Sequence, residues 1–402
     1  MSRSRQHIEF LDYVRGIAII AVFLFHLLGA VCGVSHLPWG SWFSQFEASK
    51  AYWFLLPFSL GWCGVAIFFV VSGFCIHLSF KSKPVWHEFL LRRFFRIYPA
   101  YVTALLVFAL LVPWTRIHFS MTGAAQLGSH LALIHNFDNR TFYGINVAFW
   151  SIAVEVQLYL LYPLLLMLVS RIGWQRTLFY IAALEIGLRG ISSLFLVSTG
   201  DIPYWFLGLP FMYWFSWSLG AVIADAYFCG RPLPFASHSA WFWGGIAVGS
   251  VFVKPLFSFS FLFFSIATAV VISKQLCQPQ VTIKLPVWIS RHIKTAGVWS
   301  YSIYLLHAPF LYGACAPALA IYIAATFHLA HLPHSLIVLI VGLGLWPLIV
   351  ALSGLSYHLV ELPSIVCGKR FIMLCYNGWS HKKETREPSD LNKATQIIPP
   401  GN

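Results

Sequence analysis

One stretch near the start of the chain, residues 8–31, restricts the possible folds more than any other part of the sequence. It is apolar and long enough to cross a bilayer, since a spanning helix needs roughly 20 such residues, yet it contains Arg15 and His26. These positions are eleven residues apart, so on a helix both side chains lie on one stripe, about 16 Å from each other along the axis. A charge in a spanning helix costs at least about 2.5 kcal/mol. The stripe must therefore face protein or a water-filled cavity rather than lipid.

Apolar segments recur along almost the whole chain. Of the 402 residues, 59% are hydrophobic and only 10% are charged, whereas soluble proteins average about 25% charged residues. We therefore predict an all-α fold, a polytopic transmembrane helical bundle with about ten spans. The expected spans are residues 8–31, 57–80, 98–115, 147–168, 177–197, 205–227, 236–253, 255–273, 297–325 and 335–360.

The distribution of positive charge predicts the orientation of these spans. With the N-terminus in the cytoplasm, most Lys and Arg residues lie on the cytoplasmic side, and the opposite side receives only Lys50, Arg116, Arg140 and Lys254. This arrangement explains the net charge of +13 without a nucleic-acid partner. We expect both termini in the cytoplasm and a multi-pass protein embedded in the lipid bilayer of the cell membrane, that is, the inner or plasma membrane.

The chain divides into two expected regions. Residues 1–363 form the membrane domain, and residues 364–402 form a cytoplasmic tail that we expect to be largely disordered because it is polar and charged. The eight cysteines are scattered, mostly in apolar segments, and include no CxxC pair. We therefore expect no metal site and no disulfide.

Polar residues at membrane depth are the candidates for chemistry. Ser151, Glu155 and Tyr159 recur every four residues and form one polar stripe on an otherwise apolar helix. An acidic residue inside a span is a functional candidate by default. The alternatives for Glu155 are a salt bridge to Arg15 or a hydrogen bond that holds two helices together.

A second polar stripe is expected late in the chain. Ser300, Tyr304 and His307 lie at i, i+4 and i+7 and share one helix face. A structural histidine fits this pattern as well as a catalytic or substrate-contacting one does.

Two further acidic residues are interpreted as structural. Glu185 and Arg189 are four residues apart and compensate each other. Glu361, at the cytoplasmic end of the last span, is an interfacial residue or pairs with Arg15 or Arg93.

Two segments near the cytoplasmic side allow both a structural and a functional interpretation. Arg92, Arg93 and Arg96 are common topology anchors, but if their helix begins early, Arg93 and Arg96 share a face that suits phosphate oxygens. Ser72 and Gly73 lie in a glycine-containing span whose small residues permit close helix packing. A ligand lying against Gly73 is the alternative.

Six short motifs occur in a fixed order between Leu11 and Pro363. They are LDYVRGIAIIAVFLFH, GVAIFFVVSGF, RRFFRIYPAY, HNF followed by NVAFWSIAVEVQLYLLYP, YSIYLLH and the closing ELP. Together they resemble the acyltransferase 3 family of integral-membrane O-acyltransferases. One departure is that Trp62 and Cys63 separate Gly61 from Gly64, where the family's motif usually starts with two glycines.

The resemblance implies transfer of an acyl group, most often acetyl, from a cytoplasmic acyl-CoA. The acceptor it implies is a sugar hydroxyl of a surface polysaccharide, glycolipid or similar glycan. Acyl-CoA would be a co-substrate, and no bound cofactor is expected. The motif-matched residues Arg15, His26, Arg93, Arg96 and Glu155 would be the functional set.

The spacing of these residues permits this chemistry. The cytoplasmic arginines Arg15, Arg93 and Arg96 would hold the donor phosphates, and the donor's arm would carry the thioester about 16 Å deeper, through one polar tunnel, to His26. A neutral His26 would then take the proton of the attacking hydroxyl as a general base. Glu155 would either orient His26 or bind the acceptor.

The expected acceptor contacts are Tyr304, His307, Ser151 and Tyr159. The competing function is a proton-coupled transporter or a flippase of a sugar-lipid, because such carriers also bury His, Glu and Arg in helices. Transporters more often show inverted repeats with helices broken at matching positions. The sequence shows no such pairing.

Overall fold

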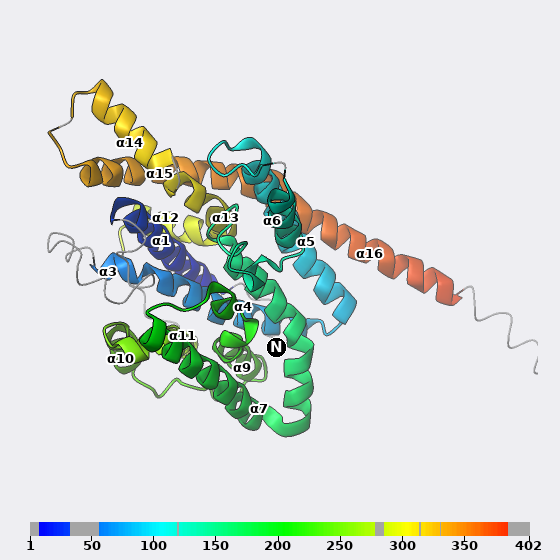
Figure 1. Cartoon of the computed structure of the whole chain (residues 1–402). Coiled ribbons are helices and arrows are strands. Elements are labelled where there is room, and N and C mark those ends of the chain that lie inside the picture. Colours follow the sequence, from blue (N-terminus) through cyan, green and yellow to red (C-terminus); the bar gives the residue numbers. More distant parts are fainter. Residues whose placement is uncertain are drawn as a thin grey trace, which may run out of the picture.

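The computed structural model describes residues 8–32, 56–118, 120–277, 285–312, 315–329 and 331–384, and within these ranges the chain forms helices and loops and no strand (Figure 1). This confirms the predicted all-α class. The α-helices are α1 (Glu9–Cys32), α3 (Leu56–Ser59), α4 (Cys63–Ser82), α5 (Trp86–Leu106), α6 (Met121–Leu131), α7 (Phe149–Thr199), α8 (Tyr204–Leu207), α9 (Trp214–Phe228), α10 (Ala240–Val251), α11 (Ser260–Cys277), α12 (Val287–Val298), α13 (Ser300–Leu311), α14 (Cys315–Thr326), α15 (His334–Ser356) and α16 (Leu362–Glu384). Short 3₁₀ turns are η3 (Leu60–Trp62), η5 (His135–Phe137), η6 (Pro210–Met212) and η7 (Lys254–Phe259), and π turns are η4 (Val107–Leu111) and η8 (Tyr357–Glu361).

Six helical segments of the described chain are long and apolar enough to cross a membrane. They are Glu9–Cys32, Pro57–Ser82, Trp86–Leu111, Phe149–Thr199, Lys254–Cys277 and His334–Cys375. A seventh results if α13 and α14 are counted as one broken span. The structure thus supports a multi-pass helical protein, while the number ten and the cytoplasmic placement of both termini stay predictions.

The longest of these segments, α7, contains a reversal. Its 51 residues would extend about 77 Å if straight, far more than the roughly 30 Å thickness of the hydrocarbon core. At Gly173 the backbone leaves the helical conformation, with φ of 77°, a value that favours glycine. Figure 1 shows the chain turning back at this point. The two halves of α7 correspond to the predicted spans 147–168 and 177–197.

Three predicted spans are shorter or more broken than expected. The segment 205–227 consists of α8, η6 and α9, and α9 has only 15 residues. The segment 236–253 contains α10, whose 12 residues are too few to cross a bilayer unaided. The segment 297–325 is divided between α13 and α14. Apolar composition alone did not distinguish these short helices from full spans.

Two helices are longer than predicted. The helix expected at 98–115 begins at Trp86, so it includes Arg92, Arg93 and Arg96. The tail of residues 364–402, expected to be largely disordered, begins as α16, which is helical to Glu384; residues 385–402 lie outside the described ranges. The physical reason is packing against α5: Phe95 lies against Gly368, and its ring centroid is 6.0 Å from that of Phe371.

Helix α1 lies inside the bundle and packs against α4, α12, α13 and α15 (Figure 1). Its contact with the start of α4 is made by glycines. A Cβ atom on Gly61 would lie 2.0 Å from the carbonyl oxygen of Ala21, and one on Gly64 would lie 2.5 Å from that of Ala18. The predicted packing role of these small residues is therefore correct, and it sets the distance between α1 and α4.

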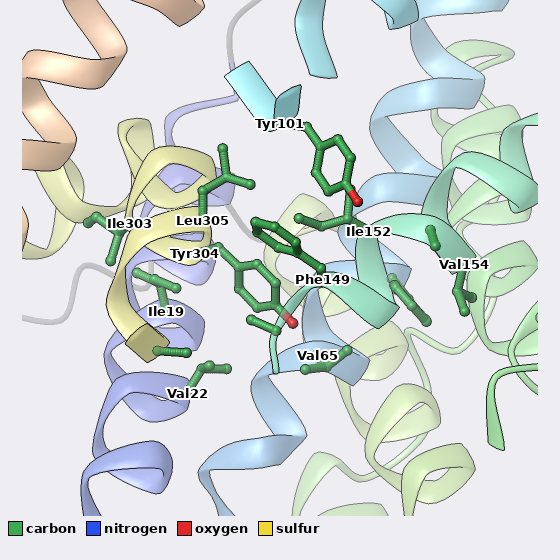
Figure 2. Packing of buried hydrophobic residues seen from close by; sticks show 14 of the residues in the cluster. Ile19, Val22, Val65, Tyr101, Phe149, Ile152, Val154, Ile303, Tyr304 and Leu305 are labelled. Carbon is green, nitrogen blue, oxygen red and sulfur yellow. The ribbon is translucent and has the colours of Figure 1, made fainter. Parts of the chain in front are cut away.

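The apolar core fixes the helices that carry the polar residues. Figure 2 shows Ile19 and Val22 of α1, Val65 of α4 and Phe149 of α7 around the ring of Tyr304, which extends from α13. The apolar members of this set are at most 8% exposed. Close packing of this kind holds the backbone positions of α1, α4, α7 and α13 relative to one another.

Candidate functional site

The structure brings most of the predicted site residues to one internal cavity, here called the polar cavity, of about 130 Å³. Five helices, α1, α4, α5, α7 and α13, contribute to its wall. Its polar lining residues are Arg15, Ser72, Cys75, Arg93, Arg96, Ser151, Glu155, Tyr159, Ser300, Tyr301 and Tyr304. The stripe predicted on residues 151–159 faces this cavity, as does the cationic end of the stripe on α1.

Glu155 is held by hydroxyl groups in the polar cavity. Its Oε1 accepts a hydrogen bond from Ser72 Oγ at 2.7 Å and one from the Tyr159 hydroxyl at 2.5 Å. Ser72 Oγ in turn accepts a hydrogen bond from the Trp217 indole at 3.3 Å. Among the described residues no salt bridge joins Glu155 to Arg15, so the hydrogen-bonding alternative is the one that the structure contains.

Arg15 has two contacts that orient its guanidinium toward the cavity. Its NH1 donates to Asp12 Oδ1 at 3.3 Å, one turn away on α1, and its NH2 lies 3.0 Å from Cys75 Sγ on α4. The side chain is partly exposed. Arg15 therefore keeps donor capacity for a further anionic group.

Arg93 and Arg96 lie in α5 and have different partners. Arg93 donates to Ser79 Oγ at 2.9 Å, but its Nε is buried with no hydrogen-bond acceptor among the described residues. Arg96 lies 3.5 Å from the buried Glu361 carboxylate, which also accepts a hydrogen bond from Ser302 at 2.9 Å. The partner of Glu361 is thus Arg96, because α5 packs against η8. Among the described residues neither of the two pairings considered from the sequence, with Arg15 or with Arg93, is present.

A larger cavity adjoins the polar cavity and shares Arg15 and Cys75 with it. This mouth cavity has a volume of about 840 Å³. The charged residues in its wall are the cations Arg15, Lys83, Arg92 and Lys369 and the carboxylates Asp12 and Glu88. Four cations against two carboxylates give an excess of two positive charges. Glu88 pairs with both Lys83 and Arg92, at 2.7 and 2.9 Å.

A third space, the aromatic cavity of about 170 Å³, contains His26. Its main lining residues are His26, Trp62, Val65, Tyr143, Trp150, Arg189, Asp201, Tyr204, Tyr213, Phe257, Phe261 and Tyr304. The sequence led us to expect Arg15 and His26 in one tunnel, and this prediction was wrong. They face two cavities that meet at Val65 and Tyr304, which line both. The Tyr304 hydroxyl is fixed at this junction by Ser151 Oγ, 2.6 Å away.

His26 is in contact with His307, and the contacts define which ring nitrogens carry hydrogen. His307 Nδ1 lies 3.1 and 3.0 Å from the carbonyl oxygens of Ile303 and Tyr304, so it carries the hydrogen in the neutral ring. His307 Nε2 is then an acceptor for His26 Nδ1, 3.1 Å away, which also lies 2.9 Å from the Val22 oxygen. His26 Nε2 is left without hydrogen, on a ring that lines the aromatic cavity.

Other predicted residues lie away from the cavities. Gly73 does not line the polar cavity; a Cβ there would lie 2.0 Å from the Trp217 carbonyl oxygen, which favours the packing interpretation. His307 is fully buried and lines none of the three cavities. Ser151 and Tyr159, expected near the acceptor, lie with the expected donor residues.

The Glu185–Arg189 pair has the structural contacts that were predicted for it. Arg189 donates to Glu185 Oε1 at 3.0 and 2.9 Å and to the carbonyl oxygens of Ser258 and Met212. Glu185 also accepts hydrogen bonds from the backbone and side chain of Ser216. These contacts join α7 to η6, η7 and α9.

Sequence reasoning missed the wall of the aromatic cavity. Its rings come from segments far apart in the chain, and no spacing rule connects them. The one available signal was Trp62, which interrupts the expected pair of glycines. Its indole lines this cavity.

A family model described as "Acyltransferase domain" matches residues 8–357. The acyltransferase MdmB of Streptomyces mycarofaciens is 27% identical over 266 residues, which cover 62% of this chain and 68% of that protein. No solved structure gave a significant match.

Proposed function

The chain belongs to the acyltransferase 3 family, and from this premise we propose that it is a membrane O-acyltransferase that moves an acyl group, in particular acetyl, from acyl-CoA to a sugar hydroxyl, with His26 as general base. The acceptor is a surface polysaccharide, a glycolipid or a similar glycoside. One observation carries the proposal: His26 lines a cavity that meets, at Val65 and Tyr304, a second cavity lined by three arginines, and its contacts assign the ring hydrogen to Nδ1, which leaves Nε2 as the base.

The mouth cavity and the polar cavity fit the two ends of a thioester donor. The mouth cavity is within the usual volume range of ligand sites, about 300–1,000 Å³, and its excess of positive charge suits the phosphates of the nucleotide. The polar cavity is narrower and suits the thin acyl-bearing arm. Arg93 Nε is a buried donor that has no acceptor among the described residues, and it supplies a hydrogen bond that a bound acyl-CoA would complete.

The reaction proceeds by direct transfer at the junction. The acceptor oxygen attacks the thioester carbonyl while its proton passes to His26 Nε2. The carbon–sulfur bond then breaks, and CoA leaves as a thiol after the imidazolium returns the proton to sulfur. His307 supports the intermediate charge because His26 Nδ1–H donates to it.

Replacement of His26 by Ala tests this role. The purified protein in lipid nanodiscs is given acetyl-CoA and a glycoside, and release of the CoA thiol is measured. The variant is expected to lose about 10²- to 10⁴-fold in kcat, the usual contribution of a general base. His87→Ala, an exposed histidine on α5, is the matched control. Full activity of the His26 variant, with normal membrane insertion, refutes the assignment.

A further inference from the structure

The aromatic cavity has an unusual charge balance. Arg189 is the one arginine or lysine among the described residues that line this cavity. Four of its five N–H groups donate to Glu185 and to the carbonyl oxygens of Ser258 and Met212, and its guanidinium carbon lies 5.3 Å from the Phe261 ring centroid. Because its charge is already paired with Glu185, Arg189 is a poor partner for an anionic group of an acceptor.

The carboxylate of Asp201 lies at the edge of the same cavity and is exposed. Its Oδ1 accepts a hydrogen bond from the Ile202 backbone at 2.8 Å, and no basic side chain in the described ranges forms an ion pair with it. Asp201 also follows directly after Gly200, the residue that ends α7. The C-terminus of a helix carries a partial negative charge, so the field at this edge attracts cations.

Two tyrosine rings stand beside this carboxylate. Tyr143 and Tyr204 line the cavity, and their ring centroids are 4.8 Å apart with an interplanar angle of 63°. Burial raises the pKa of Tyr204, and the charge of Asp201 adds to that effect. Aromatic faces attract ammonium groups. A carboxylate with two such rings is a suitable site for a protonated amine.

The inner wall of the cavity is apolar and includes the buried indole donor of Trp62. The Trp62 and Phe261 rings are stacked, with centroids 6.5 Å apart and an interplanar angle of 20°. The indole Nε1 of Trp62 has no hydrogen-bond acceptor among the described residues. Such a wall accepts the apolar face of a sugar or its aglycone and offers one hydrogen bond to a ring or hydroxyl oxygen.

Resting on the proposed function, we propose that the acceptor is a glycoside with a protonated amine, bound through Asp201 and the rings of Tyr143 and Tyr204 while its hydroxyl reaches His26. The amine is a recognition group held at the edge, and the hydroxyl is the group that is acylated. An anionic acceptor would meet Asp201 without a compensating cation.

Three 4-nitrophenyl glycosides of equal size test the proposal: the glucoside, the 2-amino-2-deoxyglucoside and the glucuronide. With acetyl-CoA as donor, the amine is expected to have a KM about fivefold lower than the glucoside, and the glucuronide the highest KM. In Asp201→Asn the KM of the amine should rise to that of the glucoside, so that the ratio of the two KM values approaches one. Asp138→Asn, an exposed carboxylate that pairs with Arg140, is the matched control.

Binding of the same three compounds without acetyl-CoA, followed by tryptophan fluorescence, separates this proposal from the proposed function. Binding in the order amine, glucoside, glucuronide without any transfer supports the cation site and refutes the acyl transfer. Transfer with no preference for the amine, or an equal effect of Asp201→Asn on all three compounds, overturns the cation site alone. If none of the compounds binds or reacts, the proposed acceptor class is wrong.

Discussion

Replacement of His307 by Ala tests how His26 is oriented. The two rings are buried and joined by a 3.1 Å contact, in which His26 Nδ1–H donates to His307 Nε2. When His26 takes the acceptor's proton, this bond becomes a hydrogen bond from a charged group, worth about 1.5–3 kcal/mol. At 1.36 kcal/mol per tenfold change in rate, its loss lowers kcat by about 10- to 150-fold.

The assay separates orientation from binding. His307 lines neither the polar nor the aromatic cavity, so the KM values for acyl-CoA and for the glycoside should stay unchanged while kcat falls. His307→Gln keeps an acceptor group on the side chain and should lose less than His307→Ala. In the double variant His26→Ala/His307→Ala the loss should equal that of His26→Ala alone, because the two residues act as a unit.

Two results would refute this reasoning. One is an unchanged kcat in His307→Ala, which would mean that the Val22 carbonyl suffices to orient His26. The other is a double variant whose loss is the product of the two single losses, since independent residues multiply their effects.

Two further predictions concern the donor site and the pH dependence of stability. Arg93→Ala should raise the KM for acyl-CoA about tenfold, more than Arg92→Ala, because Arg92 is already paired with Glu88; an unaltered KM would exclude a contact between Arg93 and the acyl donor. Burial lowers the pKa of His130 to about 4 and, together with His130, that of His135 to about 3, against about 6.5 in the unfolded chain. Both rings are thus neutral when folded, so their contribution to stability is complete above about pH 6.5 and declines by about 1 kcal/mol per ring and pH unit as the pH falls toward about 4. Melting curves between about pH 7.5 and 4.5 should show this decline, and His135→Phe should flatten it; parallel profiles would contradict the assignment.

The features that the sequence predicted correctly are those that one helix determines by itself. Ser151, Glu155 and Tyr159 lie four residues apart, and a helix places them on one face whatever surrounds it. The same holds for the early start of α5, which was considered because Arg93 and Arg96 would then share a face. Local spacing therefore predicted most of the polar cavity.

The features that the sequence did not predict depend on contacts between distant segments. His26 and His307 are 281 residues apart, and no spacing rule relates them. Glu361 lies beside Arg96 because of the way α5 packs against η8. The division of the expected tunnel results from Tyr304, whose position follows from the packing of α13 on α1, α4 and α7. Such contacts are set by tertiary packing rather than by hydrophobic pattern.

The division between the polar and aromatic cavities has a consequence for the membrane itself. Cavities inside a helix bundle that spans a membrane would dissipate the ion gradient if a continuous column of water joined them to both sides. Val65 and Tyr304 interrupt such a column with an apolar side chain and a hydroxyl already bonded to Ser151. In the proposed reaction the acyl-bearing arm itself fills the polar cavity while the acyl group passes the junction at Val65 and Tyr304. Catalysis and electrical insulation are therefore compatible in one protein.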